Sequence, residues 1–206
     1  TFPDVACPST FADWIEELTA QGITTGCGGG FFCPENLVTR RQMDAWAADF
    51  DNWGICDTAC FHLFSRTPFA WDAARRWAKS PREFVKRAAF ALMASLVLRD
   101  KAATDAKFLA LLPLIEKGAQ DERNFVKKGV HWALRTVGKR NAVLNAGAIA
   151  VSRRLAAAEE AAPRWVGKDA LRELAGPAVQ ARLARKPSAT GRAGARRPAA
   201  APGKRG

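Results

Sequence analysis

The chain has 206 residues, of which 48 % are apolar and 25 % are charged, so it is long enough to bury the core of an ordinary globular protein. It contains no stretch of roughly 18 apolar residues, which excludes a membrane-spanning helix. Lys and Arg number 32 against 20 Asp and Glu, a formal net charge of +12. Such an excess is typical of proteins that bind a polyanion, most often nucleic acid.

The charge is unevenly distributed along the chain. Residues 1–39 contain no Lys or Arg and five acidic residues, so the remainder carries all 32 basic residues and 15 acidic ones. This asymmetry indicates units with different partners. We expect a small Gly-rich head over residues 1–39 and a basic main domain over residues 40–184.

Within the head, Ser9 or Thr10 precedes apolar residues at helical spacing, and a Gly-rich loop with a proline turn follows. Cys27 and Cys33 in this loop could close a short disulfide in an oxidising compartment. The chain has five cysteines, an odd number that excludes complete pairing within one chain. The other three are Cys7, Cys56 and Cys60.

From residue 40 onward, amphipathic segments of about 10–20 residues alternate with short breaks. Asp57 stands where a helix could begin and is a candidate N-cap. Pro113 lies inside a helical pattern and is expected to kink its helix. No segment requires a β-strand, so we predict an all-α domain.

A repeat of about 40 residues runs through this domain. "EFVKRAAFALMASL" is followed by "NFVKKGVHWALRTV" and then by "RWVGKDAL". Their aromatic residues Phe84, Phe125 and Trp165 occupy equivalent positions, which predicts a HEAT-like solenoid of alternating helices. A basic residue follows each aromatic residue by three positions, and these residues are predicted to form a ladder on one surface, or else a solvated outer face. They are Arg87, Lys128 and Lys168.

After Ala184 the composition changes to basic residues, Pro, Gly and Ala, with no acidic residue. A segment with so few large apolar residues cannot bury enough surface to fold. We therefore expect a disordered basic tail over residues 185–206. Such a tail could attract phosphates without specificity, or it could act only on solubility.

The main domain resembles the DNA alkylation repair family, the AlkD-type HEAT-like DNA glycosylases, over about residues 40–184. The residues that carry the resemblance are "FDNWGICD", "WAKSPREFVKRAAFALMASLVLRDK", "FLALLPLIEKGAQDERNFVKKGVHWALRTVGKRN" and "RWVGKDALREL". The resemblance implies an all-α solenoid whose concave basic face holds duplex DNA. It also implies removal of N-alkylated purines such as 3-methyladenine and 7-methylguanine.

Residues 1–43 resemble a single S-layer homology-type module, through "FPDV", "FADWIEEL", "QGITTGCGGGFFCP" and "VTRRQM". The repair family has several helices before its "DNW" element, at positions where this chain has the head. The chain is therefore predicted to be a chimera whose solenoid is truncated at its N-terminus. Alternatively, the head is a small capping subdomain with no activity of its own.

The resemblance to the repair family also implies site residues. Trp53 and Asp57 match its W-x-x-x-D element, Trp132 matches its second pocket tryptophan, and Arg87 matches an arginine of the helix motif. Because an N-alkylated purine is cationic, a carboxylate that stabilises the developing sugar cation and tryptophan faces that attract the base would suffice for excision. Without the resemblance, the two tryptophans could equally be core residues and Asp57 a helix cap.

Basic residues near these positions are expected to hold DNA phosphates. They are Lys86, Arg87, Lys127, Lys128, Arg135, Lys139, Arg140 and Lys168. We expect no cofactor and no metal, because the spacing C-x3-C-x-H of Cys56, Cys60 and His62 matches no common zinc site. Both cysteines are predicted to be buried and unreactive.

Three functions remain open on the sequence alone. The first is a glycosylase acting on duplex DNA with alkylated bases, and the second is a HEAT-like DNA-binding protein without catalysis. The third is a surface-attachment protein, which the basic body and the absence of a signal peptide at the start argue against. We expect a monomer that is cytoplasmic and nucleoid-associated and makes no contact with a membrane.

Overall fold

The computed structural model describes residue 20 and residues 38–185. The chain divides into two units, Thr1–Gln42 and Met43–Gly206. In the first unit, the Thr39 hydroxyl accepts from the backbone N–H of Gln42, whose side chain accepts in return from the backbone N–H of Thr39. This reciprocal capping box begins helix α2. Three of the cysteines lie outside the described residues. So do the predicted head helix, except for residue 20, and the predicted tail, except for residue 185.

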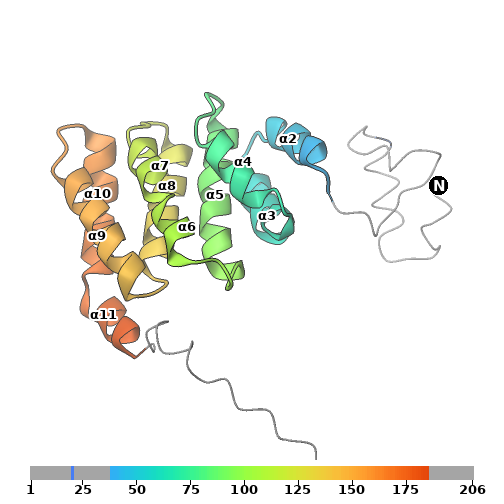
Figure 1. Ribbon diagram of the computed structural model, residues 1–206. Coiled ribbons are helices and arrows are strands. Elements are labelled where there is room, and N and C mark those ends of the chain that lie inside the picture. Colours follow the sequence, from blue (N-terminus) through green and yellow to red (C-terminus); the bar gives the residue numbers. More distant parts are fainter. Residues whose placement is uncertain (1–19, 21–37, 186–206) are drawn as a thin grey trace, which may run out of the picture. The chain divides into compact units, whose positions relative to one another are not determined.

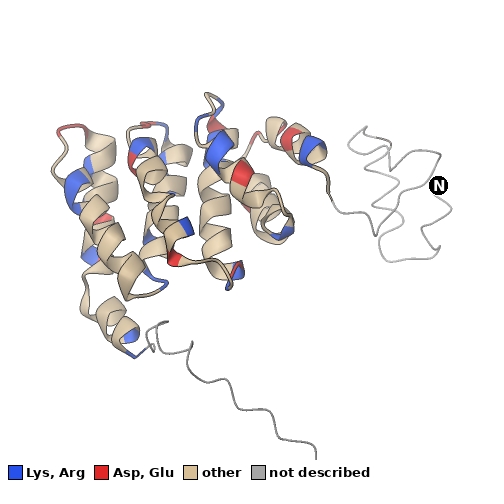
Figure 2. Cartoon of the chain, in the orientation of Figure 1, with Lys and Arg blue, Asp and Glu red and all other residues tan. Residues whose placement is uncertain are grey.

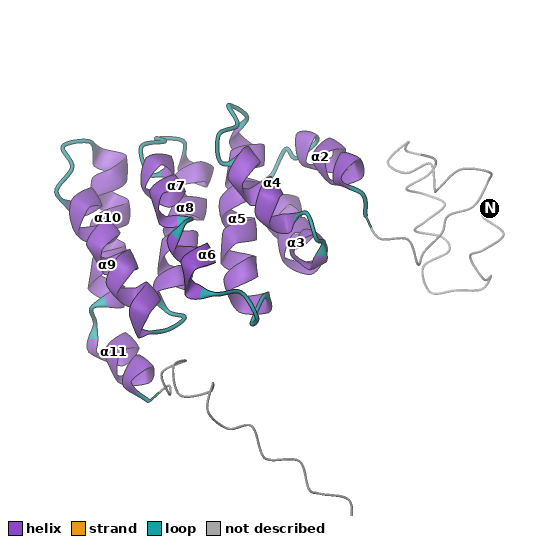
Figure 3. Cartoon of the chain, in the orientation of Figure 1, coloured by secondary structure: helices purple, strands orange, loops and turns teal. Residues whose placement is uncertain are grey.

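All the described elements are helical, and no strand occurs in residues 38–185 (Figures 1 and 3). In chain order they are α2 (Arg40–Ala48), α3 (Trp53–His62), the 3-10 helix η1 (Phe64–Arg66), α4 (Ala70–Trp77), α5 (Glu83–Arg99), α6 (Asp105–Leu109), α7 (Leu112–Gly118), α8 (Asn124–Gly138), α9 (Ala142–Ala156), α10 (Ala161–Leu174) and α11 (Pro177–Ala184). The all-α prediction is therefore confirmed.

Within the second unit, the helices alternate between two layers, as the repeat predicted. Helices α5, α8 and α10 carry the three copies of the repeat and lie in sequence, with α5 against α8 and α8 against α10 (Figure 1). In the other layer, α4 packs against α5, α7 packs against α8, and α9 packs against both α8 and α10. Helix α3 also packs against α5. This arrangement is a helical-repeat solenoid.

Close packing between the layers depends on small residues. Helix α5 is buried from Arg87 to Val97, and four of the eleven residues there are Ala. Gly167 in α10 marks the closest approach of α9, because a Cβ atom at this position would lie 2.2 Å from the backbone nitrogen of Ala156. Glycine is therefore required at residue 167 for these two helices to pack at this distance.

Two local predictions are wrong. Helix α3 is capped by Asn52, whose side chain accepts from the backbone N–H of Ile55 at 3.0 Å, so Asp57 lies in the middle of the helix and is not a cap. Pro113 does not kink a continuous helix. It is the second residue of α7, after a break that follows α6, and proline fits there because the first turn of a helix leaves its N–H groups unpaired.

Candidate functional site

Asp57 and Arg87 form the centre of the site. Arg87 donates from Nε to Oδ1 of Asp57 at 2.9 Å and from Nη2 to Oδ2 at 2.7 Å. Its remaining nitrogen, Nη1, donates to the backbone carbonyl of Phe125 at 2.8 Å. The Arg87 side chain is 8 % exposed and that of Asp57 is 20 % exposed. One buried guanidinium thus connects α3, α5 and α8, and its carboxylate partner remains open to solvent on one side.

The neighbouring residues explain why this pair can form. Cys56 and Cys60 are buried on the face of α3 that contacts α5, and their sulfurs lie 3.6 and 3.4 Å from the carbonyl oxygens of Phe84 and Ala88. Helix α3 is thereby held against the first turns of α5. These contacts confirm that both cysteines are buried helix residues, and burial raises the pKa of the Cys60 thiol.

Trp53 lies one helical turn before Asp57, as the first residue of α3. It is 54 % exposed, so the core interpretation of this residue is wrong. The Arg87 guanidinium carbon lies 5.9 Å from the centre of its ring. Trp53, Asp57 and Arg87 therefore form one contiguous group with an exposed aromatic surface.

Trp132 lies on the helix that crosses Arg87, one turn beyond the point of closest approach. Helix α8 passes Arg87 at Gly129, where a Cβ atom would lie 3.5 Å from Cγ of Arg87. Trp132 follows Gly129 by three residues, so it lies on the same face of α8, one turn further along. It is partly buried and makes no ring–ring or cation–ring contact with any other described residue.

Several basic residues that were expected to hold phosphates make ion pairs within the protein. Lys86 lies 2.8 Å from a carboxylate oxygen of Asp121. Arg135 and Lys139 both pair with Glu173 of α10, Lys139 at 2.8 Å. The Arg135 guanidinium and the Lys139 ammonium lower the pKa of Glu173 to about 2. These pairs hold neighbouring repeats together.

Arg140 has a structural role. Its guanidinium donates to the carbonyl oxygens of Val97, Asp100 and Ala103 at 2.7, 3.0 and 3.2 Å. It also lies 4.4 Å from the ring centre of Phe108. Arg140 therefore closes the segment between α5 and α6, and its donors are directed into the protein.

Three predicted phosphate ligands have a different environment. Lys128 and Lys168 are exposed and make no side-chain hydrogen bond or ion pair with any residue that the structure describes. Lys127 lies with its ammonium 5.4 Å from the ring centre of Trp165. Figure 2 shows the basic and acidic residues along the helices.

A second polar and aromatic group, between α8 and α10, was not predicted as a site. His131 is buried, and its ring centre lies 4.8 Å from that of Trp165. Its Nε2 lies 2.8 Å from a carboxylate oxygen of Asp169 but has no well-aligned hydrogen bond. Burial lowers the pKa of His131. The only sequence signal for this group was the position of Trp165 in the repeat.

The described residues contain no cluster of His, Cys, Asp and Glu that could hold a metal ion. They also contain no helix long and apolar enough to cross a membrane.

The solenoid and this site define a helical-repeat protein that carries an oriented carboxylate next to exposed tryptophan. The chain belongs to the family described as DNA alkylation repair enzyme, whose model matches residues 34–174. No curated protein and no solved structure matches the chain. Membership in this family supports a role in DNA repair with DNA as the partner. The likeness of residues 1–43 to an S-layer module stays a prediction.

Proposed function

We propose that the protein is a DNA glycosylase that hydrolyses the N-glycosidic bond of N-alkylated purines, of the 3-methyladenine and 7-methylguanine class, in duplex DNA. The observation that carries this proposal is the Asp57 carboxylate, which is oriented by two bonds from Arg87 and lies one turn from the exposed Trp53. Family membership supports the choice of substrate.

The chemistry needs little from the protein, because the alkylated base already carries a positive charge. When the bond between the sugar and the base breaks, its electron pair neutralises the base and leaves a cation-like sugar. A carboxylate fixed near that sugar stabilises the developing charge, and water then adds and releases a proton. Each oxygen of Asp57 accepts one bond from Arg87 and retains acceptor capacity.

In this proposal Arg87 is a positioning residue. Three of its five N–H groups donate to protein atoms and its side chain is only 8 % exposed, so it is poorly placed to hold a phosphate. The same pairing partly neutralises the Asp57 carboxylate. That neutralisation favours the second candidate function, a DNA-binding protein without catalysis.

The exposed ring of Trp53 suits a cationic base, since a cation over a tryptophan face is favourable by about 0.5–2 kcal/mol. Trp132, on the adjacent turn of α8, would supply a second aromatic surface. Lys128 and Lys168, which are exposed and without described partners, are the best candidates for phosphate contacts.

The test is release of 7-methylguanine from duplex DNA, measured by mass spectrometry, with wild-type protein and with Asp57→Asn. We expect Asp57→Asn to lower excision by about 10²–10³-fold, the usual loss for one preorganised electrostatic group, and to retain DNA binding. Excision by folded Asp57→Asn at the wild-type rate would contradict the catalytic role. Absence of excision by wild-type protein that binds duplex DNA would favour the second candidate function.

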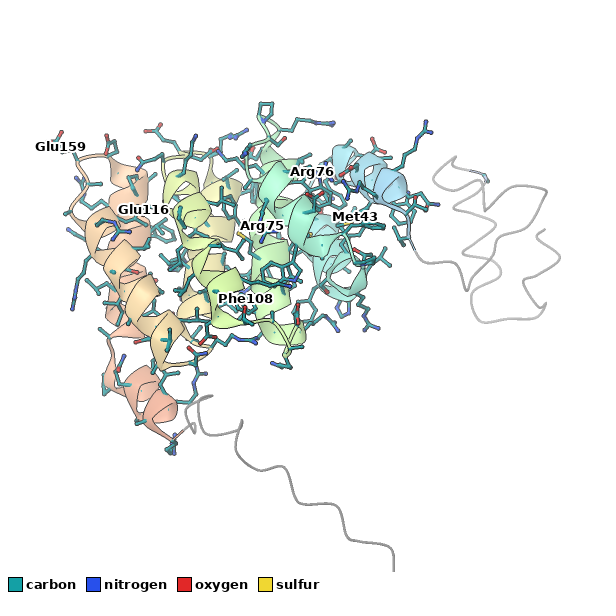
Figure 4. All side chains as sticks on the ribbon, viewed as in Figure 1. Met43, Arg75, Arg76, Phe108, Glu116 and Glu159 are labelled. Carbon is teal, nitrogen blue, oxygen red and sulfur yellow. The ribbon has the colours of Figure 1, made fainter. Side chains whose placement is uncertain are left out.

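Glu116→Gln is a matched control. Glu116 accepts two bonds from Arg154, at 2.7 and 2.8 Å, in the same two-pronged geometry (Glu116 is labelled in Figure 4). This pair joins α7 to α9 and contains no residue of the proposed site. We expect Glu116→Gln to leave excision unchanged, so that a loss confined to Asp57→Asn is attributable to the site.

A further inference from the structure

We propose that Trp165 is a stacking platform for an unpaired nucleotide base, with Lys127, Lys128 and Lys168 around it as phosphate contacts. This site goes beyond the excision chemistry: it contains none of Trp53, Asp57, Arg87 and Trp132, and it shares only Lys128 and Lys168 with the phosphate contacts proposed for the glycosylase. Its ligand class is single-stranded nucleic acid, or the unpaired part of a partly duplex strand.

The Trp165 ring is exposed and yet held in place by its neighbours. Trp165 is 43 % exposed, although its ring contacts His131 at 4.8 Å and Lys127 at 5.4 Å. His131 is itself buried and lies next to Asp169. These neighbours fix the orientation of the indole, so a base that stacks on its exposed surface would lose little additional side-chain entropy.

Trp165 differs from its equivalents in the other two copies of the repeat. Phe84 and Phe125 occupy the equivalent positions in α5 and α8, but they contact each other, with ring centres 5.3 Å apart, and both are partly buried. Their rings therefore contribute to helix packing. The third copy has the largest aromatic side chain, and more of its ring faces solvent.

Lysine residues surround the Trp165 ring. Lys168 follows Trp165 by three residues and so lies on the same face of α10, one turn along. Lys128 precedes His131 by three residues on α8, and Lys127 contacts the ring directly. Lys128 and Lys168 have no ion-pair partner in the part of the chain that the structure describes. An aromatic surface among ammonium groups suits a ligand that is aromatic and anionic, which a nucleotide is.

The same charges argue against other occupants. Residues 186–206 carry six Lys and Arg and no acidic residue, so this segment would be repelled by the three lysines. A fully paired duplex is also a poor ligand, because its base faces are covered by their neighbours in the stack. An unpaired base has a free face that can stack on an aromatic side chain.

The experiment measures fluorescence anisotropy of a labelled oligothymidine of about 12 nucleotides and of a labelled blunt hairpin duplex, both without damage. We expect Trp165→Leu to weaken binding of the single strand by about fivefold or more and to change binding of the duplex by less than about twofold. Trp165→Phe retains an aromatic face and should stay within about threefold of wild type. Circular dichroism and the Tm confirm that each variant folds.

Lys168→Glu provides a second variant that leaves the core intact, since Lys168 is exposed. It should weaken binding of the single strand more than Lys117→Glu, which makes the same charge change at an exposed residue of α7. Asp57→Asn should bind the single strand like wild type, so failure of the excision proposal is distinguishable from failure of this one.

Three outcomes would overturn the proposal. The first is wild-type affinity of Trp165→Leu for the single strand, and the second is an equal loss for the single strand and the duplex. The third is wild-type protein that self-associates in sedimentation while Trp165→Leu is monomeric and still binds the single strand, which would make this surface an interface between copies of the chain.

Discussion

Asp57 in α3 and Arg87 in α5 form a two-pronged ion pair, with N–O distances of 2.9 and 2.7 Å, and the third donor of the same guanidinium is bound by α8. The pair holds the Asp57 carboxylate in one orientation while 20 % of that side chain stays exposed. It also gives Asp57 a structural contribution in addition to the proposed catalytic one, and the two contributions can be measured separately.

The first prediction concerns the coupling between these two residues. Asp57→Asn, Arg87→Gln and the double variant should form a thermodynamic cycle with a coupling of about 1–3 kcal/mol in the free energy of unfolding, because either single change leaves a buried polar group without its partner. Urea unfolding measures it. If the effects of the single changes add to within about 0.5 kcal/mol, the pair does not stabilise the solenoid.

The second prediction concerns Arg140, which was expected to contact DNA. Arg140→Met should lower the free energy of unfolding by about 1–3 kcal/mol, because carbonyl groups between α5 and α6 lose their donor. Duplex affinity, measured by anisotropy on the folded variant, should change by less than about twofold. Arg153→Met, at an exposed position of α9, is the control for stability. If Arg140→Met instead has normal stability and impaired DNA binding, Arg140 contacts DNA as the sequence predicted.

The third prediction concerns acid stability. Arg135 and Lys139 lower the pKa of Glu173 from 4.5 to about 2, so the folded protein binds the Glu173 proton less readily than the unfolded chain does. The stabilisation from these pairs is therefore fully present above about pH 4.5 and is lost as the pH falls through about 2. The difference in Tm between wild type and Glu173→Gln should shrink over this range. A difference that stays constant from pH 5 down to about pH 2.5 would mean that the Glu173 pairs are not formed in solution.

The fourth prediction concerns the contact between α9 and α10. Gly167→Ala should cost about 3 kcal/mol or more, because the added Cβ would meet backbone atoms of Ala156, Leu155 and Ser152 within 2.7 Å, and backbone atoms cannot move aside as side chains can. Gly147→Ala is the comparison, since its Cβ would meet only the ends of two leucine side chains. Thermal unfolding should show a larger loss for Gly167→Ala. Equal losses would indicate that the helices separate easily.

The sequence by itself determined the helical class and the repeat. Both depend on local information, namely the spacing of apolar residues and the equivalent positions of Phe84, Phe125 and Trp165 along the chain. Helices α5, α8 and α10 carry these three residues in that order. The pairing of a tryptophan with an aspartate one turn later, Trp53 and Asp57, was likewise visible. The position of the cap at Asn52 was missed, because Asn52 and Asp57 are both good capping residues and the helix could have begun at either.

Only the tertiary structure decided which basic residues are free to meet a ligand. Arg87 finds Asp57 across 30 residues of sequence, Arg135 finds Glu173 across 38, and Arg140 finds a carbonyl across 43. Helical periodicity places a charge on a face of its own helix, but its partner is chosen by the helix that packs beside it. Which carboxylate or carbonyl a basic residue meets depends on the distance and register between neighbouring helices. The sequence therefore identifies the basic residues, but only the packed solenoid distinguishes those with partners inside the protein from Lys128 and Lys168.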